Sequence, residues 1–229
     1  YNQAAKFKYM FGGKAETPVV IRTMVGAGIN AAAQHSQMLT SIFTHIPGLK
    51  VVCPSNPYDA KGLLIQSIRD NDPVIFCEHK SLYGVEGEVS EESYVIPFAE
   101  ANVMRDGGDV TIVAYGMMVG KAMDAAKKLA KEGVECDVID LRTLSPIDME
   151  TVLESVENTG RLVVVDEANP RCSIATDVSA QVAQQAFKSL KAQIEMVTAP
   201  HTPVPFASSL EDLYIPSSDS VAIAVRKTL

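Results

Sequence analysis

The stretch DVTIVAYGMMVGKAMDAAKKLAKEGVECDVIDL, residues 109–141, contains the pattern that decides the fold. Its beginning, Val110–Ala114, is an apolar run of the kind found in buried strands. Residues 119–131 then carry apolar side chains at helical spacing, and Gly133 follows as a typical helix end. A second strand is predicted over residues 136–141. Because two strands joined by a helix need a crossover connection, this unit predicts parallel neighbours in one sheet.

The same alternation continues to the C-terminal side of this stretch. Helices are predicted over residues 146–156 and 174–187, and strands over residues 162–165 and 194–198. The sequence Ser145-Pro146-Ile147-Asp148 predicts a helix start, with Ser145 as N-cap and proline at the first helical position. Strands that alternate with helices of this length predict an open, mainly parallel sheet with helices on both faces.

The N-terminal part predicts half of another sheet of the same kind. Strands are expected over residues 19–23, 49–52 and 74–78, and a helix over residues 56–69 that Asn56-Pro57 opens. From Ser81 to Phe98 the pattern dissolves into glycines, glutamates and a proline, which indicates an exposed loop. We therefore expect a first domain over residues 1–80, a linker over 81–108 and a second domain over 109–229. The predicted class is α/β, with two open, mainly parallel sheets.

Composition narrows the possible functions. The formal net charge of −8 disfavours binding to nucleic acid or to an anionic membrane. No apolar run approaches the roughly 20 residues that span a bilayer. The cysteines show no paired CxxC spacing and the histidines show no metal-ligand spacing, which predicts reduced thiols in a cytoplasmic protein without a zinc site. These residues are Cys53, Cys77, Cys136, Cys172, His35, His45, His79 and His201.

His35 is the candidate catalytic residue. It lies in Ala31-Ala32-Ala33-Gln34-His35-Ser36-Gln37, where small side chains leave room for a ligand, just after Gly26-Ala27-Gly28. Apolar residues from Met38 to Ile46 follow at helical spacing, so we expect His35 near the N-terminus of an amphipathic helix. The helix dipole would disfavour the imidazolium there, and a neutral imidazole can both accept and donate a proton. The alternative is a structural histidine fixed by hydrogen bonds.

Two other functional classes were weighed against catalysis by this histidine. A nicotinamide enzyme is not supported, because neither residues 115–120 nor residues 26–28 carry the three-glycine spacing that binds a dinucleotide. An interaction module would instead use acidic residues to contact a basic partner. Asp166-Glu167 and Glu211-Asp212 are the candidates for such contacts, and ordinary solvated surface is the other interpretation of both pairs.

Several motifs together resemble a known family, the β-subunits of thiamine-diphosphate-dependent 2-oxoacid and acetoin dehydrogenases. The resemblance covers essentially the whole chain, and residues 24–34 are most similar to the acetoin-cleaving branch. It implies that residues 1–80 are the C-terminal part of a transketolase-like pyrimidine-binding domain and that residues 109–229 are a transketolase C-terminal-like domain. The matching motifs are Asn2–Lys6, Val20–Arg22, Ala33–Gln37, His45–Val52, Asp59–Leu63, Ile68–Asp70 and Leu141–Pro146.

The resemblance also implies cofactors and partners. An α-subunit is expected to hold thiamine diphosphate and magnesium in an assembly of two α- and two β-chains, while the β-chain supplies the aminopyrimidine side and contacts a second β-chain. Acetoin, or pyruvate in the alternative, would be cleaved and the acetyl group passed to the lipoyl group of an acyltransferase, with His35 handling protons and Gln34 and Ser36 fixing its orientation. A non-catalytic dimerisation or docking fragment is the third possibility.

The family further implies a segment before Tyr1, which carries the glutamate that activates the cofactor. We therefore expect the 229-residue chain alone to be inactive and to self-associate through an unpaired sheet edge.

The turn after the predicted helix ending at Arg69 is a candidate cation site. The last carbonyls of a helix have no partner within it, and Pro73 helps to stop the helix, so these oxygens can converge on a hard cation. A turn whose carbonyls bind water is the alternative. In the resembling family this turn holds potassium, which implies the backbone carbonyls of Val19, Ser67, Ile68, Asp70 and Asp72 as ligands.

Overall fold

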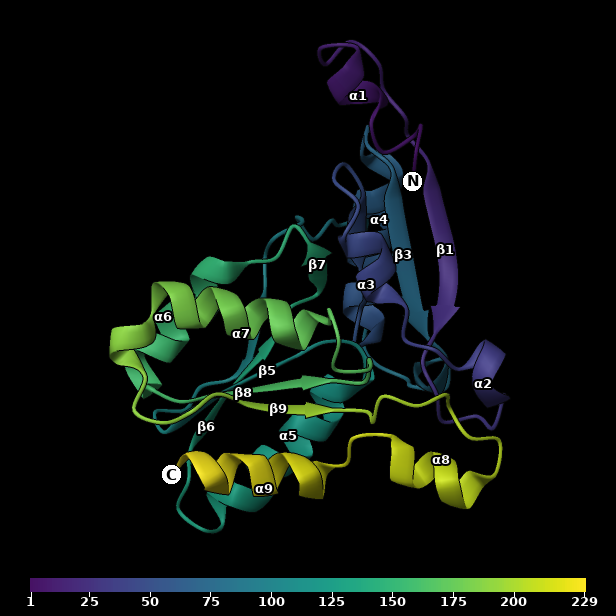
Figure 1. The fold of residues 1–229 in the computed structure, drawn as a ribbon. Coiled ribbons are helices and arrows are strands. Elements are labelled where there is room, and N and C mark those ends of the chain that lie inside the picture. The colour runs from purple at the N-terminus through teal and green to yellow at the C-terminus, as the bar shows by residue number, and fades with distance from the viewer.

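The computed structural model describes all residues 1–229 and contains two sheets, each with helices on both faces (Figure 1). Most neighbouring strands are parallel, which confirms the predicted α/β class. In Figure 1 the long strands of the first sheet run nearly upright, and those of the second sheet run across the view below it. No helix combines the length and the apolar character needed to cross a bilayer.

The first sheet has the order β1-β3-β2-β7. Strands β1, β3 and β2 are parallel, and β7 pairs antiparallel with β2. Successive residues of β3 face opposite sides: Ile75 and Cys77 pack with α3, whereas Val74 and Phe76 pack with α4. The elements of this part are α1 (Phe7–Met10), β1 (Val20–Val25), α2 (Ala32–His35), α3 (Thr40–Thr44), β2 (Lys50–Val52), α4 (Pro57–Arg69), β3 (Val74–His79) and the later strand β7 (Thr143–Ser145).

The second sheet has the order β4-β6-β5-β8-β9, and only β4 is antiparallel to its neighbour. Helices α6 and α7 lie on one face and α5 and α9 on the other (Figure 1). The elements are β4 (Asn102–Arg105), β5 (Val110–Ala114), α5 (Met117–Ala130), β6 (Cys136–Asp140), α6 (Met149–Thr159), β8 (Leu162–Asp166), α7 (Ile174–Gln185), β9 (Glu195–Thr198), α8 (Ser208–Tyr214) and α9 (Ser218–Thr228).

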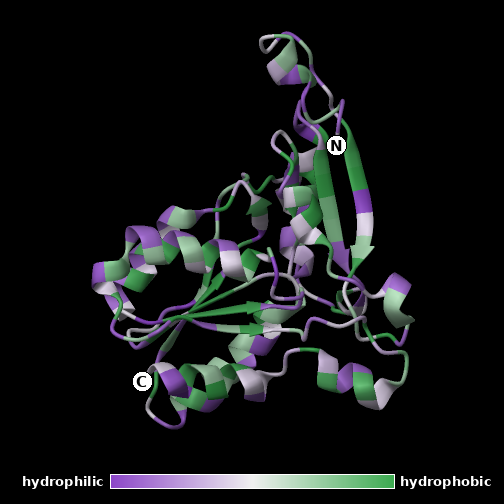
Figure 2. Cartoon of the chain, in the orientation of Figure 1, coloured by the Kyte–Doolittle hydropathy of each residue, from purple (hydrophilic) through white to green (hydrophobic).

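One hydrophobic core joins the two sheets. The α3 side of the first sheet and the α6–α7 side of the second contribute to a single cluster of 23 buried residues, which includes Val51 of β2 and Val113 of β5. The strands that supply it are mostly apolar along their length (Figure 2). Because this core crosses the domain boundary, the two domains pack as one body rather than hanging on a flexible linker.

The predicted helix start at Ser145-Pro146 is wrong. Ser145 is the last residue of β7, its hydroxyl donates to the Leu49 carbonyl at 3.1 Å, and α6 begins at Met149. Asp148 is the N-cap, accepting from the Thr151 amide at 3.1 Å. The reason is that β2 offers an open edge, and three residues gain a strand partner there before the helix begins.

Other local differences are smaller. The first ten residues, expected to lie within a helix, form only the single turn of α1. Residues 83–101 contain no helix or strand, as expected of the loop, although Ile96 is buried against α4. Strand β4 and the C-terminal helices α8 and α9 were not predicted. Strand β1 pairs with β3 alone, and Ile21 and Met24 on it are 52% and 63% exposed.

Candidate active site

His35 is exposed, but its helix differs from the one expected. It is the last residue of the four-residue helix α2, and α3 begins only at Thr40. Asn30 and Ala32 have φ angles of 56° and 62°, in the left-handed region, so the chain changes direction before α2 instead of entering one long helix. The expected effect of a helix N-terminus on His35 is therefore wrong. The His35 ring forms no hydrogen bond within the chain, which leaves both nitrogens free for a ligand.

The neighbours of His35 do not hold its ring directly. Gln34 is exposed, whereas Ser36 is 1% exposed and its hydroxyl has no hydrogen-bond partner. The backbone closes the loop instead, because the Gly26 amide donates to the Gln37 carbonyl at 3.1 Å. The orientation of His35 is thus set by the conformation of residues 26–40, which we call the His35 loop.

Glu167, at the end of β8, accepts hydrogen bonds from the first domain. One oxygen accepts from the Ala27 amide at 2.6 Å, and the other lies 2.7 Å from Nε2 of His79. Nδ1 of His79 accepts from the Ser81 amide at 3.2 Å, so the hydrogen of this ring lies on Nε2 and is donated to Glu167. Both side chains are at most 1% exposed, and each partner compensates the burial of the other.

Glu211, on α8, holds the next residues of the same loop. Its carboxylate accepts from the Gly28 amide at 3.0 Å, and from the amide and the side-chain nitrogen of Asn30 at 2.9 and 3.0 Å. Only 2% of Glu211 is exposed. These contacts place a carboxylate of the C-terminal segment against the backbone that leads to His35.

Asp166 holds the far end of the His35 loop through Tyr115. The Tyr115 hydroxyl donates to Asp166 at 2.6 Å and lies 3.2 Å from the Thr40 hydroxyl. Burial raises the pKa of Asp166, although the hydrogen bond from Tyr115 opposes that shift. Burial, followed by the nearby Asp166 charge, raises the pKa of Tyr115 well above its usual value. Tyr115 is therefore a permanent donor at physiological pH.

The expected surface role of these acidic residues is therefore wrong for three of the four. Asp166, Glu167 and Glu211 are buried at the boundary between the domains, and Asp212 alone is exposed. The reason is that the backbone of the His35 loop and the Tyr115 hydroxyl provide donors that replace water. The sequence did carry one signal, since Asp166 and Glu167 end a parallel strand, where α/β sheets place functional groups.

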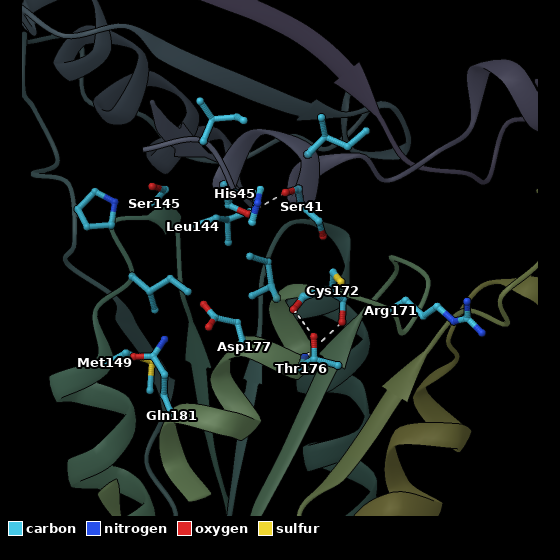
Figure 3. Close-up of a pocket in the computed structure, with 17 residues that line it drawn as sticks. Ser41, His45, Leu144, Ser145, Met149, Arg171, Cys172, Thr176, Asp177 and Gln181 are labelled. Carbon is cyan, nitrogen blue, oxygen red and sulfur yellow. Dashed lines mark hydrogen bonds between the residues drawn. The ribbon is translucent and has the colours of Figure 1, made fainter. Parts of the chain in front are cut away.

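A cleft of about 1000 Å³ lies elsewhere on the domain boundary, between α3, the β7–α6 connection and α7 (Figure 3). His45, Cys172 and Asp177 line it, while Arg171 points away from Asp177. No three His, Cys, Asp or Glu side chains converge on a possible metal position. His35 does not line this cleft, and α3 stands between α2 and α7 in Figure 1. Size alone therefore does not identify the site of chemistry.

The cysteines do not add a nucleophile to the His35 loop. All four are unpaired; Cys53, Cys77 and Cys136 are buried, and Cys172 is exposed. Burial raises the pKa of Cys77 to about 12 and that of Cys136 to about 11. Such thiols are protonated at physiological pH and react slowly, because the thiolate is the reactive form.

The turn after α4 provides carbonyl oxygens suited to a hard cation. The Val19 and Ser67 carbonyls accept from Val74 and Asp70, and those of Ile68, Asp70 and Asp72 accept no backbone hydrogen bond. The Asp70 and Asp72 carboxylates are instead taken by Lys50, at 2.7 and 3.1 Å. Carbonyl oxygens with free lone pairs are ligands that potassium could use, so the donor set fits the proposed ion.

Potassium is expected to raise the melting temperature of the assembled enzyme relative to lithium at equal ionic strength. An ion that binds only the folded state contributes about 1.4 kcal/mol when its concentration is ten times its Kd. Differential scanning calorimetry in matched chloride salts measures the difference. Identical melting in the two salts would favour a turn whose carbonyls bind water.

Asp140, at the end of β6, should make stability depend on pH. It is fully buried beside Ser55, and burial raises its pKa to about 7. The unfolded side chain titrates near about 3.9, so protonated Asp140 favours folding below about pH 4, and this contribution is lost as the pH rises to about 7.

Replacing Asp140 with asparagine should remove this dependence, because the amide keeps an acceptor for the Arg142 amide and a donor for Ser55. Between about pH 4 and pH 7 the wild-type chain should lose up to about 4 kcal/mol relative to Asp140→Asn. Urea unfolding across this range measures the difference, with the exposed Asp106→Asn as control. Parallel stability curves for wild type and Asp140→Asn would refute the assignment.

Comparisons with known proteins agree with the two-domain geometry. Residues 1–86 match the transketolase pyrimidine-binding domain, and residues 99–221 match the transketolase C-terminal domain. A solved structure titled "Split gene transketolase, inactive beta4 tetramer" aligns with a TM-score of 0.78 and 25% identity, over 97% of this chain and 71% of that one.

Three curated relatives illustrate the sequence similarity. The β-subunit of acetoin:2,6-dichlorophenolindophenol oxidoreductase from Cupriavidus necator is 76% identical over 100% of this chain and 68% of its own length. The protein of the same name from Bacillus subtilis is 56% identical, over 96% and 64%. The pyruvate dehydrogenase E1 component subunit beta of Bacillus subtilis is 45% identical, over 99% and 70%. The chain thus spans about two thirds of the length of these relatives.

Proposed function

The chain belongs to the transketolase-like family of acetoin and pyruvate dehydrogenase β-subunits, and from this premise we propose that it works with an α-subunit to cleave acetoin. The observation that carries the substrate is the difference in identity, 76% to an acetoin-specific relative against 45% to a pyruvate-specific one. The acetyl group produced would pass to a lipoyl group on an acyltransferase. Cytoplasmic location is part of the proposal, supported by four unpaired cysteines.

We assign the aminopyrimidine side of thiamine diphosphate to the first domain and the diphosphate with magnesium to the α-subunit. The match of residues 1–86 to a pyrimidine-binding domain supports this division. When bound, thiamine diphosphate supplies the nucleophilic carbon that makes cleavage of the carbon–carbon bond possible. The chain itself contributes a site wall, an exposed imidazole and the residues that hold it.

His35 would act as the general acid and base. Its ring nitrogens are free of internal hydrogen bonds, so one can accept a proton from the acetoin hydroxyl and return it to a lipoyl sulfur. Such transfers need the imidazole within about 3 Å of the reacting atom, and a loop closed by backbone hydrogen bonds holds it more narrowly than a free chain would.

The partners proposed are an α-subunit, a second β-chain and the lipoyl-bearing acyltransferase. The open edge of β1, with Ile21 and Met24 exposed on it, supports association through the first domain, because an unpaired apolar strand edge binds another chain readily. The alternatives remain a pyruvate-specific β-subunit and a non-catalytic docking fragment.

Substrate competition tests this proposal. A β-chain of the relatives' full length that carries this sequence is assembled with an α-subunit, thiamine diphosphate, magnesium and a lipoylated acceptor. We expect kcat/KM for acetoin to exceed that for pyruvate by at least tenfold. A preference for pyruvate would select the alternative enzyme, and no turnover of either substrate would select the docking fragment.

A further inference from the structure

We infer that Glu167 and Glu211 are positioning residues that fix His35 for proton transfer, so that the second domain takes part in catalysis through the His35 loop. This inference rests on the proposed function of His35. It gives the C-terminal domain a role beyond holding subunits together.

The first step is the number of contacts that the two carboxylates make. Between them they accept from the backbone amides of Ala27, Gly28 and Asn30, three donors in four consecutive residues. Amides that lie away from regular structure need such partners when they are buried, and here the partners come from the other domain. The loop backbone is therefore fixed relative to the second sheet.

The second step is that the loop adopts a conformation it would not hold unaided. Gly26 and Gly28 have φ angles of 89° and 101°, and Asn30 and Ala32 follow with positive φ as well. Non-glycine residues persist in this region only where the surrounding structure dictates it. The three hydrogen bonds to Glu211, two of them from Asn30, provide that constraint.

The third step is that both ends of the loop are attached to adjacent residues of one strand. Glu167 holds Ala27, and its neighbour Asp166 reaches Thr40 through Tyr115. His35 lies in the stretch between these two attachments and projects to solvent. A shift at the end of β8 would thus displace the imidazole, and a displacement of about 1 Å can lower a rate about a hundredfold.

The variant Glu211→Gln tests this role, because the amide keeps the size of the side chain but turns a donor toward the loop amides. Glu154→Gln on α6 is the matched control, being the same change at an exposed residue without hydrogen bonds. Glu211→Asp restores the charge, and Glu167→Gln provides a second site if Glu211→Gln does not fold.

Two measurements are made on the chain itself and one on the assembled enzyme. Hydrogen exchange of the amides of residues 27–30 and the NMR signals of the His35 ring report the loop position. Steady-state kinetics report kcat and KM for acetoin. We expect Glu211→Gln to accelerate exchange at least tenfold, shift the His35 signals and lower kcat about ten- to a hundredfold with KM unchanged. Glu211→Asp should recover part of kcat, and Glu154→Gln should change nothing.

The outcomes separate the inference from the proposed function. Unchanged exchange and His35 signals in Glu211→Gln would overturn the attachment itself. A displaced loop with unchanged kcat would overturn its catalytic role. If the wild-type assembly shows no turnover, the proposed function and the catalytic role fail together, while the exchange and NMR results still decide whether the two carboxylates hold the loop.

Discussion

Replacing His35 with alanine is expected to lower acetylation of the lipoyl acceptor by roughly 10²- to 10⁴-fold, the usual loss when a general acid or base is removed. The ring is exposed and has no internal partner, so its removal disturbs no contact of the fold. The loop around it is held by Glu167 and Glu211, which the substitution leaves in place. The loss should therefore appear in kcat without a change in melting temperature.

The measurement uses the assembled enzyme with acetoin and a lipoylated acceptor. His201→Ala is the matched control, because His201 is an exposed histidine of the second domain that also forms no hydrogen bond. It should retain the wild-type rate. Near-normal acetylation by His35→Ala would remove this residue from the mechanism.

Gly26→Ala is expected to destabilise the chain by roughly 3–5 kcal/mol, the range for leaving a buried charge without its partner. A Cβ atom added to Gly26 would lie 2.1 Å from Nε2 of His79, and the φ angle of 89° adds backbone strain. The His79 side chain is fully buried, so it can move only by breaking its bond to Glu167. For a chain of this size the melting temperature should fall by roughly 6–20 °C.

The control for this change is Gly133→Ala. Gly133 has a similar φ of 83°, but nothing lies within 4 Å of an added Cβ, so only the backbone strain of about 1–2 kcal/mol applies. Calorimetry of both variants separates strain from collision. Equal losses in the two variants would show that the His79–Glu167 contact does not tighten the loop.

The strands of the second sheet were predictable because they are buried on both faces. Val110–Ala114 and Leu162–Asp166 are continuous apolar runs that meet helices on each side, so their burial can be read directly from composition. Strand β7 was missed because it has three residues and gains its stability from pairing with β2, about 90 residues earlier. No local pattern records such a partner, and the capping pattern of Ser145-Pro146 pointed to a helix.

The same reason limits what the sequence says of the site. His35 could be singled out from its small neighbours and its motif, and the residues that hold its loop could not. Glu167 contacts Ala27 across 140 residues of sequence, and Glu211 contacts Asn30 across 181. Acidic residues are usually solvated, and only the fold shows that backbone amides replace the water around these two.

The most direct test of the central claim, a β-subunit that needs its α-partner, is acetoin-dependent reduction of 2,6-dichlorophenolindophenol. The assay contains thiamine diphosphate and magnesium and compares the 229-residue chain alone, the α-subunit alone, and the α-subunit with a β-chain of the relatives' full length that carries this sequence. We predict dye reduction in the combined sample and none in the other two. Reduction by the 229-residue chain alone, with host dehydrogenases excluded, would contradict the division of labour between the subunits.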